Sequence, residues 1–208
     1  MSEPRCICDS SRAELVQSEY KDYLKCGFCE VIVRKELLEL SEERERYGQH
    51  QNSIEDSRYI NFLQPAIDAA LEILKPGQIL LDYGCGPSPV LAEIIKRQGF
   101  ESDYWDPCFF DKKFKVSEYD VITCTEVAEH FASPITSFKK LFGLLASGGS
   151  LVLETFRYDD VKDFEDWYYQ RDPTHVCFYN RTSFEVLARD FGCSLKVLSE
   201  SLSVFTKC

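Results

Sequence analysis

Apolar and polar residues follow two distinct periods along the chain from about residue 60 onward. Four apolar runs have the length and composition of buried strands: QILLDY, FESDYW, YDVITC and SLVLET. In residues 65–75, 89–99, 133–147 and 183–191, apolar side chains recur every three or four positions, as in a helix. Strands that alternate with helices predict a doubly wound α/β domain, and the last runs, SLKVLS and SVFT, predict a terminal antiparallel hairpin.

Two of the predicted helices have recognisable first turns. Ser133 and Pro134 suit the N-cap and N1 positions of the helix that precedes SLVLET. Thr182 and Glu185 have the spacing of a capping box before the last helix. These residues predict where both helices begin.

The chain before the α/β domain divides into two parts. Residues 1–35 have too few apolar side chains to form a core of their own. Residues 36–75 begin charged and helix-prone and end in the first predicted helix, which indicates a helical connector and a polar lid. We therefore expect an N-terminal segment (1–35), a connector and lid (36–75) and the α/β domain (76–208).

Two close cysteine pairs lie in the N-terminal segment, Cys6 with Cys8 and Cys26 with Cys29. A structural zinc site needs four thiolates delivered by two tight turns, and the metal then supplies folding energy that a missing core cannot. The second pair has the spacing of a zinc ribbon, whereas the first is one residue shorter. The pattern predicts a small zinc ribbon with these four ligands; the alternative is four free thiols in a flexible tail.

Charge and hydropathy narrow the class of protein. The formal net charge of −11 disfavours a nucleic acid partner, because backbone binding usually requires a basic patch. No apolar run approaches the length of a bilayer span, so we expect no membrane insertion. The first residues, MSEPRCICDS, lack the apolar stretch of a signal peptide, and we expect a cytoplasmic protein. The oligomeric state stays open.

The stretch LDYGCGPSP includes the end of the first predicted strand, and its glycine loop contains the start of a dinucleotide fingerprint. Pro87 and Pro89 remove two backbone N–H groups that would otherwise hold a phosphate at the next helix. Asp106 ends the next strand, where a carboxylate can accept both hydroxyls of a ribose. A glycine turn that grips a ribose without a pyrophosphate indicates S-adenosylmethionine rather than a nicotinamide or flavin dinucleotide.

Four motifs in order resemble those of the class I S-adenosylmethionine-dependent methyltransferases. They are LLDYGCGPSP, DYWDP, YDVITCTEVAEHF and LLASGGSLVLET, and the resemblance covers the chain from about residue 60 to its C-terminus. It implies a Rossmann-like, seven-stranded sheet that ends in an antiparallel hairpin. The cofactor contacts that it implies are Asp82, Tyr83, Gly84 and Gly86 for the methionine portion, Asp106 for the ribose, and Cys124 and Thr125 at the reactive end.

The segment between Asp106 and Tyr119 departs from this family. The third strand and the acidic motif on the adenine side are shortened and indistinct there. We therefore assign no residue to the adenine.

Acidic residues and histidines gather on the predicted acceptor side. If a helix begins after YDVITC, then Glu126, Glu129 and His130 are spaced i, i+3, i+4 and share one face. His175 follows the next strand and should reach the same edge of the sheet. Two carboxylates and two imidazoles could hold a divalent cation that fixes an acceptor hydroxyl and lowers its pKa. Without a metal, Glu126, His130 and His175 would serve the acceptor directly, with a histidine as the base.

The Glu-x-x-Glu-His stretch with a later histidine resembles the metal site of small-RNA 3′-terminal 2′-O-methyltransferases. The stretch alone resembles ubiquinone-biosynthesis O-methyltransferases. We expect a methyltransferase that uses S-adenosylmethionine, acts on a small molecule at oxygen and holds a structural zinc; whether the acceptor site also holds a second divalent metal stays open. The alternatives are a metal-dependent RNA 2′-O-methyltransferase, which a basic groove would favour, and a non-catalytic partner-binding protein of the same fold.

Overall fold

The fold was analysed in a computed structural model that describes residues 6–8, 15–17, 20, 22–37 and 53–208. The polar lid expected within residues 36–75 falls mostly on residues 38–52, which lie outside the described residues.

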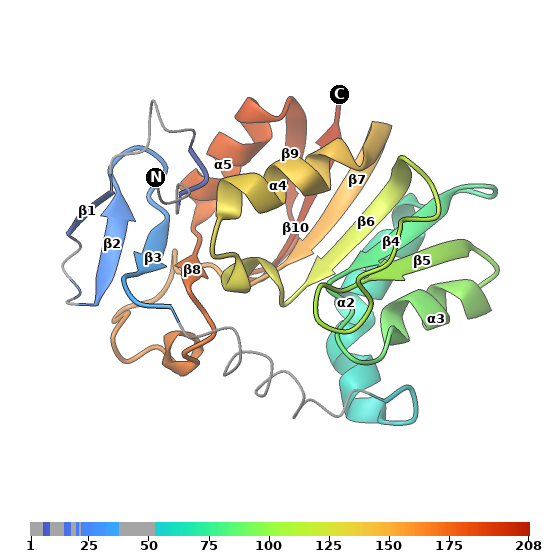
Figure 1. The fold of residues 1–208 in the computed structure, drawn as a ribbon, viewed down its shortest axis with the longest axis horizontal. Helices are drawn as coiled ribbons and strands as arrows, with labels where there is room; N and C mark the ends of the chain where they lie inside the picture. Colours follow the sequence, from blue (N-terminus) through green and yellow to red (C-terminus); the bar gives the residue numbers. More distant parts are fainter. Residues whose placement is uncertain (1–5, 9–14, 18–19, 21, 38–52) are drawn as a thin grey trace.

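A large mixed sheet organises most of the described residues (Figure 1). From edge to edge its strands are β5 (Glu101–Trp105), β4 (Ile79–Tyr83), β6 (Tyr119–Thr125), β7 (Leu145–Glu154), β10 (Leu202–Lys207) and β9 (Cys193–Val197). The first four are parallel, whereas β10 runs antiparallel to both β7 and β9. The predicted α/β fold with a terminal antiparallel hairpin is therefore confirmed.

Helices cover both faces of this sheet. Successive side chains of a strand point to opposite faces, and apolar residues at successive positions therefore need a cover on each side. Leu80 of β4 packs in the core beneath α2 (Ser57–Ile73) and α3 (Val90–Arg97). Leu81, the next residue, packs in the core beneath α4 (Pro134–Gly143) and α5 (Arg181–Asp190). None of the described helices is long and apolar enough to cross a membrane.

The sheet has six strands among the described residues, not the expected seven. Residues 106–118 hold an isolated bridge between Asp106 and Phe110 and then return directly to β6. This connection is fixed to β5 by two hydrogen bonds: the ammonium of Lys112 and the backbone N–H of Lys115 both donate to the carboxylate of Asp103. So short a connection has no room for a further helix and strand, because a parallel crossover alone takes a dozen or more residues.

Two predicted helix starts differ from the structure, and one agrees. Helix α4 begins at Pro134 with Ser133 as its N-cap, as predicted. Helix α5 instead uses a capping box of Asn180 and Ser183. Helix α2 begins eight residues before Pro65, because the Asp56 carboxylate caps it by accepting the N–H of Arg58 at 2.9 Å.

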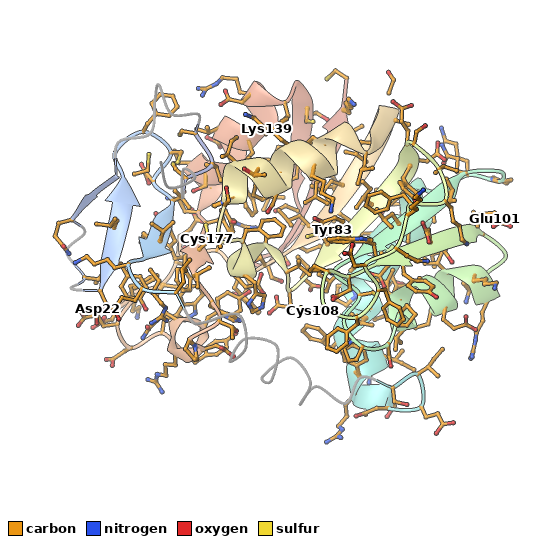
Figure 2. The ribbon with its side chains drawn as sticks, viewed as in Figure 1. Asp22, Tyr83, Glu101, Cys108, Lys139 and Cys177 are labelled. Atoms are coloured by element: carbon orange, nitrogen blue, oxygen red, sulfur yellow. The ribbon has the colours of Figure 1, made fainter. Side chains whose placement is uncertain are left out.

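A second sheet joins the N-terminal segment to the large domain. Its strands are β1 (Leu15–Gln17), β2 (Tyr23–Cys26), β3 (Ile32–Arg34) and β8 (Cys177–Phe178), in that order. Strand β8 comes from the chain after β7, and Val33 pairs with Cys177. Figure 2 shows Cys177 where the small sheet meets the rest of the molecule. Two short 3₁₀ helices, η1 (Ala128–His130) and η2 (Tyr168–Arg171), precede this junction in the chain.

Candidate active site

A cavity of about 800 Å³ lies at the carboxyl ends of β4, β5 and β6. The loops that follow these strands form its wall, with contributions from α2, α4 and the loop before β8. Its volume falls in the range of small-molecule sites, and its position is where open α/β sheets bind their ligands.

The glycine loop after β4 approaches the cavity closely. Gly84 has a φ of +82°, and its N–H donates a 2.7 Å hydrogen bond to the carbonyl of Trp105. A Cβ atom built on Gly84 would lie 2.4 Å from Cγ2 of Val127. Both the backbone conformation and the lack of space therefore require glycine here.

Asp106 connects the glycine loop to the turn after β5. Its Oδ2 accepts the N–H of Gly86 at 3.0 Å, and its Oδ1 accepts those of Cys108 at 2.8 Å and Phe109 at 3.1 Å. A carboxylate has about four lone-pair sites, so this buried group can still accept a ligand hydroxyl. Asp106 thus shapes the loop on which the predicted ribose contact depends.

All of the other predicted cofactor residues except Cys124 line the cavity. Asp82, Tyr83, Gly86 and Thr125 line the cavity together with Gly84 and Asp106. Burial raises the pKa of Asp82 to about 7. Cys124 does not line the cavity; it is fully buried in the core on the α4 side, because it precedes Thr125 on β6 and faces the opposite way.

Three acidic side chains lie close together where β6 and β7 end. Glu126 follows β6 and lines the cavity, Glu129 is fully buried in η1, and Glu154 ends β7. Burial raises the pKa of Glu126 to about 9, and the charges of Glu129 and Glu154 add to the effect. Burial, and then Glu129, raise the pKa of Glu154 to about 7. Neither oxygen of Glu129 accepts a hydrogen bond from any described residue.

Two histidines lie beside Glu129 in the wall of the cavity. Nδ1 of His130 lies 2.9 Å from the carbonyl of Thr174, and Nδ1 of His175 lies 2.7 Å from that of Tyr169. Such bonds fix the tautomer with a proton on Nδ1, so that Nε2 carries the lone pair. Nε2 of His130 lies 3.8 Å from Oε1 of Glu129. One ligand atom each from Glu129, His130 and His175 can be chosen so that all lie within 4.8 Å of one another.

Glu126 lies outside this group of three, contrary to the expectation that it shares a helical face with Glu129 and His130. Only residues 128–130 form a helical turn, and Glu126 has a φ of +52°. Its backbone N–H donates to the carbonyl of Glu154. The bend at Glu126 therefore separates its side chain from the two that follow.

The predicted cysteine group is assembled between the small sheet and the first turns of α4 and α5. Cys6, Cys8, Cys26 and Cys29 are fully buried, their sulfurs lie within 4.8 Å of one another, and none forms a disulfide. The sulfurs of Cys6 and Cys29 are 3.4 Å apart. A tetrahedron with zinc–sulfur bonds of about 2.3 Å places its sulfurs about 3.8 Å apart, so the four thiols have room for such an ion.

Sequence reasoning missed Glu154, Phe62 and Phe156 at this site. Glu154 ends a predicted strand at the ligand-binding edge, and that position was a usable signal. A second hollow of about 520 Å³ shares Phe62, Glu126, Asp172 and His175 with the cavity. Phe156, Tyr168, Tyr169 and Arg171 complete its wall. Phe62, Phe156 and the segment of Tyr168, Tyr169 and Arg171 reach this wall from distant parts of the chain.

Comparisons with known proteins agree on one class. A family model described as a methyltransferase domain matches residues 55–197. A comparison with curated protein sequences found no match.

Several solved structures share the fold. An O-methyltransferase family protein from Burkholderia thailandensis has a TM-score of 0.56 at 16% identity, and the match covers 79% of this chain but only 62% of that one. A SAM-dependent methyltransferase from Archaeoglobus fulgidus has a TM-score of 0.52 at 20% identity, covering 67% and 71%. The plantazolicin methyltransferase BpumL, solved with a monoazolic desmethylPZN analogue and SAH, has a TM-score of 0.51 at 14% identity, covering 80% and 89%.

Proposed function

This chain belongs to the methyltransferase family, and on that premise we propose that it transfers the methyl group of S-adenosylmethionine to a hydroxyl of a small-molecule acceptor. One observation carries the proposal: a single cavity contains both the glycine loop and the group formed by Glu129, His130 and His175. Donor and acceptor bound in one cavity can be aligned for in-line displacement, which supplies most of the acceleration for an already activated sulfonium.

The donor half would use the glycine loop and the two aspartates. Gly84 allows close backbone approach, and the prolines at 87 and 89 lower the capacity of the loop to hold phosphate. Asp106 keeps acceptor sites for ribose hydroxyls beyond the backbone bonds that it accepts. Asp82, buried at the end of β4, would accept a hydrogen bond from the amino acid portion of the cofactor.

The acceptor half fits a divalent cation. Glu129 presents two buried oxygens with no hydrogen-bond donor among the described residues, beside two imidazoles that are held by their Nδ1 atoms. Carboxylate and imidazole ligands suit Mn, Fe or Zn, and three such ligands leave positions open for a substrate. A cation held there would act as a Lewis acid that lowers the pKa of the acceptor hydroxyl.

The side chains around this group would hold and move a proton. When no cation is bound, the ring of His175 is neutral near physiological pH, because burial lowers its pKa, and its Nε2 can accept a proton; with a cation bound, that lone pair would serve as the metal ligand instead. The raised pKa of Glu126, about 9, keeps that carboxyl protonated in the absence of a cation and able to donate a hydrogen bond to the acceptor. In the reaction the methyl–sulfur bond breaks, a methyl–oxygen bond forms, and the hydroxyl proton passes to the base.

The walls of the second hollow favour a small acceptor with an apolar or aromatic body. Phe62, Phe156 and Tyr168 supply ring faces beside His175, and the guanidinium of Arg171 supplies a positive charge to this wall. An RNA acceptor is disfavoured by the net charge of −11 and by the carboxylates that line the cavity.

The cysteine group would hold a structural zinc. Four buried sulfurs with no opening to the cavity match a closed site, which stabilises the fold and takes no part in the reaction. This zinc would stabilise the small sheet, whose strands are short.

Calorimetric titration with S-adenosylhomocysteine tests the donor half. We expect micromolar binding to the wild type and at least ~100-fold weaker binding to Gly84→Ala, because the new methyl group would collide with Val127. Gly99→Ala is the matched control: Gly99 has a similar φ of +90°, but a Cβ there meets nothing within 4 Å. Absence of binding to the wild type would overturn the proposal.

Transfer itself is measured with methyl-labelled cofactor and a panel of small hydroxylated acceptors, with short RNA oligomers in parallel. Label that reaches oxygen of a small molecule supports the proposal. Label that reaches only RNA would favour the 2′-O-methyltransferase alternative. If S-adenosylhomocysteine binds but no oxygen acceptor is methylated, the small-molecule O-transfer proposal fails while the donor site stands.

A further inference from the structure

Backbone carbonyls of the loop of residues 169–175 form hydrogen bonds to both histidines of the acceptor site. The carbonyls of Tyr169 and Thr174 contact the Nδ1 atoms of His175 and His130. His175 itself belongs to this loop, which between η2 and β8 has no regular secondary structure. The ring positions therefore depend on whatever fixes the backbone of the loop.

Arg34, the last residue of β3, contacts this backbone at three carbonyls. Its Nη2 donates to the carbonyls of Gln170 at 2.6 Å and Asp172 at 3.4 Å, and its Nε donates to that of His175 at 3.2 Å. The guanidinium lies 5.2 Å from the ring centre of Tyr23. The Tyr23 hydroxyl in turn donates to Oε1 of Gln170 at 2.6 Å.

The small sheet extends this attachment to the cysteine group. Strand β3 follows Cys29 closely and pairs with β8, and the N–H of Arg34 donates to the carbonyl of Val176 at 2.9 Å. The N–H of Val176 donates to the carbonyl of Glu129 at 2.8 Å. A continuous set of hydrogen bonds thus runs from the N-terminal sheet to the two turns that carry Glu129 and the histidines.

We propose that Arg34 is a positioning residue for His130 and His175. It acts from the N-terminal sheet by fixing the carbonyls of Gln170, Asp172 and His175 in the loop of residues 169–175. The proposal rests on the proposed function, since the positioned rings are those of the acceptor site. A planar guanidinium can bridge several carbonyls at once, whereas the single ammonium of lysine cannot reproduce that fork.

The test compares Arg34→Ala and Arg34→Lys with a matched control, Arg157→Ala. Arg157 is also mostly buried and donates to a loop carbonyl, that of Ser199, but it contacts a different loop. Hydrogen exchange of zinc-loaded protein is followed by mass spectrometry. We expect residues 169–176 to exchange at least ~10-fold faster in both Arg34 variants, and at the wild-type rate in Arg157→Ala.

A second readout is Mn²⁺ affinity, measured by electron paramagnetic resonance on zinc-loaded protein. Mn²⁺ prefers oxygen and nitrogen to sulfur and so reports on the acceptor site. Loss of a residue that orients metal ligands typically weakens binding by about 10–100-fold, and we expect this of Arg34→Ala but not of Arg157→Ala.

Four outcomes bear on the proposal. Faster exchange confined to 169–176, with weaker Mn²⁺ binding, supports it. Unchanged exchange overturns it, as does unchanged Mn²⁺ affinity where the wild type binds the ion. If the wild type binds no Mn²⁺, the metal in the proposed function fails, and Arg34 is then judged on exchange alone.

Discussion

The cysteine group and the Glu129–His130–His175 group differ in both chemistry and exposure. The four sulfurs are fully buried and lie away from the cavity. The second group combines oxygen and nitrogen ligands, and its three residues all line the cavity. A soft, closed set suits a metal that stabilises the fold, whereas a mixed, open set suits a metal that meets a substrate.

The two groups also differ in how the chain assembles them. Cys26 and Cys29 belong to one tight turn, and so the spacing of the sequence nearly fixes their geometry. Glu129 and His175 come from different loops that meet only because β8 pairs with β3 and Val176 bonds to η1. The closed group can be identified from local spacing, whereas the open group needs the tertiary fold.

The largest expected effect follows from removing one sulfur of the closed group. We predict that Cys26→Ser loses its zinc and about 4 kcal/mol or more of unfolding free energy, as is typical when a structural metal site is broken. Elemental analysis and chemical denaturation measure both. Cys208→Ser, at an exposed thiol, is the control. Wild-type zinc content in Cys26→Ser would contradict the comparison.

An intermediate effect is expected from the open group. We predict that Glu129→Gln weakens Mn²⁺ binding by at least ~100-fold, because a central carboxylate ligand is lost. It should also bring the raised pKa values of Glu126 and Glu154 closer to normal, because Glu129 contributes to both shifts.

Glu126→Gln sharpens this result, because Glu126 lies in the same cavity but outside the group of three. We expect less than a ~10-fold change in its Mn²⁺ affinity. Equal losses in both variants would restore the four-residue ligand set that the sequence indicates.

A further difference between the two groups concerns pH. The raised pKa values of Glu154, about 7, and Glu126, about 9, mean that the folded protein retains protons which the unfolded chain has released. Stability of the protein without Mn²⁺ should therefore fall as pH rises from about 5 to about 9. His175, whose pKa is lowered, acts oppositely below its ordinary value, so the fall should be clearest above about pH 7.

Denaturation curves across this pH range, with and without Mn²⁺, measure the effect. Added Mn²⁺ should flatten or reverse the slope, because binding requires deprotonated ligands. The same pH series on the zinc content should show no comparable change in the closed group. A slope that Mn²⁺ leaves unchanged would place the acidic cluster outside any metal site.

Much of the fold could be predicted because its signals are local. The strands β4, β5 and β6 fall on apolar runs, and the terminal hairpin follows from two short runs near the end of the chain; β7 begins five residues before the run SLVLET, within a stretch predicted as helix. The missing third strand could be suspected from the poor pattern before Tyr119. The start of α5 was predicted wrongly because Thr182 and Asn180 both suit a cap, and only the observed hydrogen bonds distinguish them.

The candidate site was predictable where it depends on strand ends. Asp82, Asp106 and Thr125 line the cavity because the carboxyl ends of parallel strands meet at one edge. Cys124 does not, because a strand turns alternate side chains to opposite faces. Glu126 lies outside the group of three because its backbone adopts a left-handed φ of +52°, which the sequence pattern does not reveal.

The sequence by itself determined the α/β order of elements, the glycine loop and the two closely spaced cysteine pairs, because each depends on residues only a few positions apart. The tertiary structure alone decided that Glu154 joins the acidic cluster, that β3 pairs with β8, and that Arg34 reaches the loop of His175. These contacts join residues that are far apart in the chain, and their geometry is set by how the two sheets pack together.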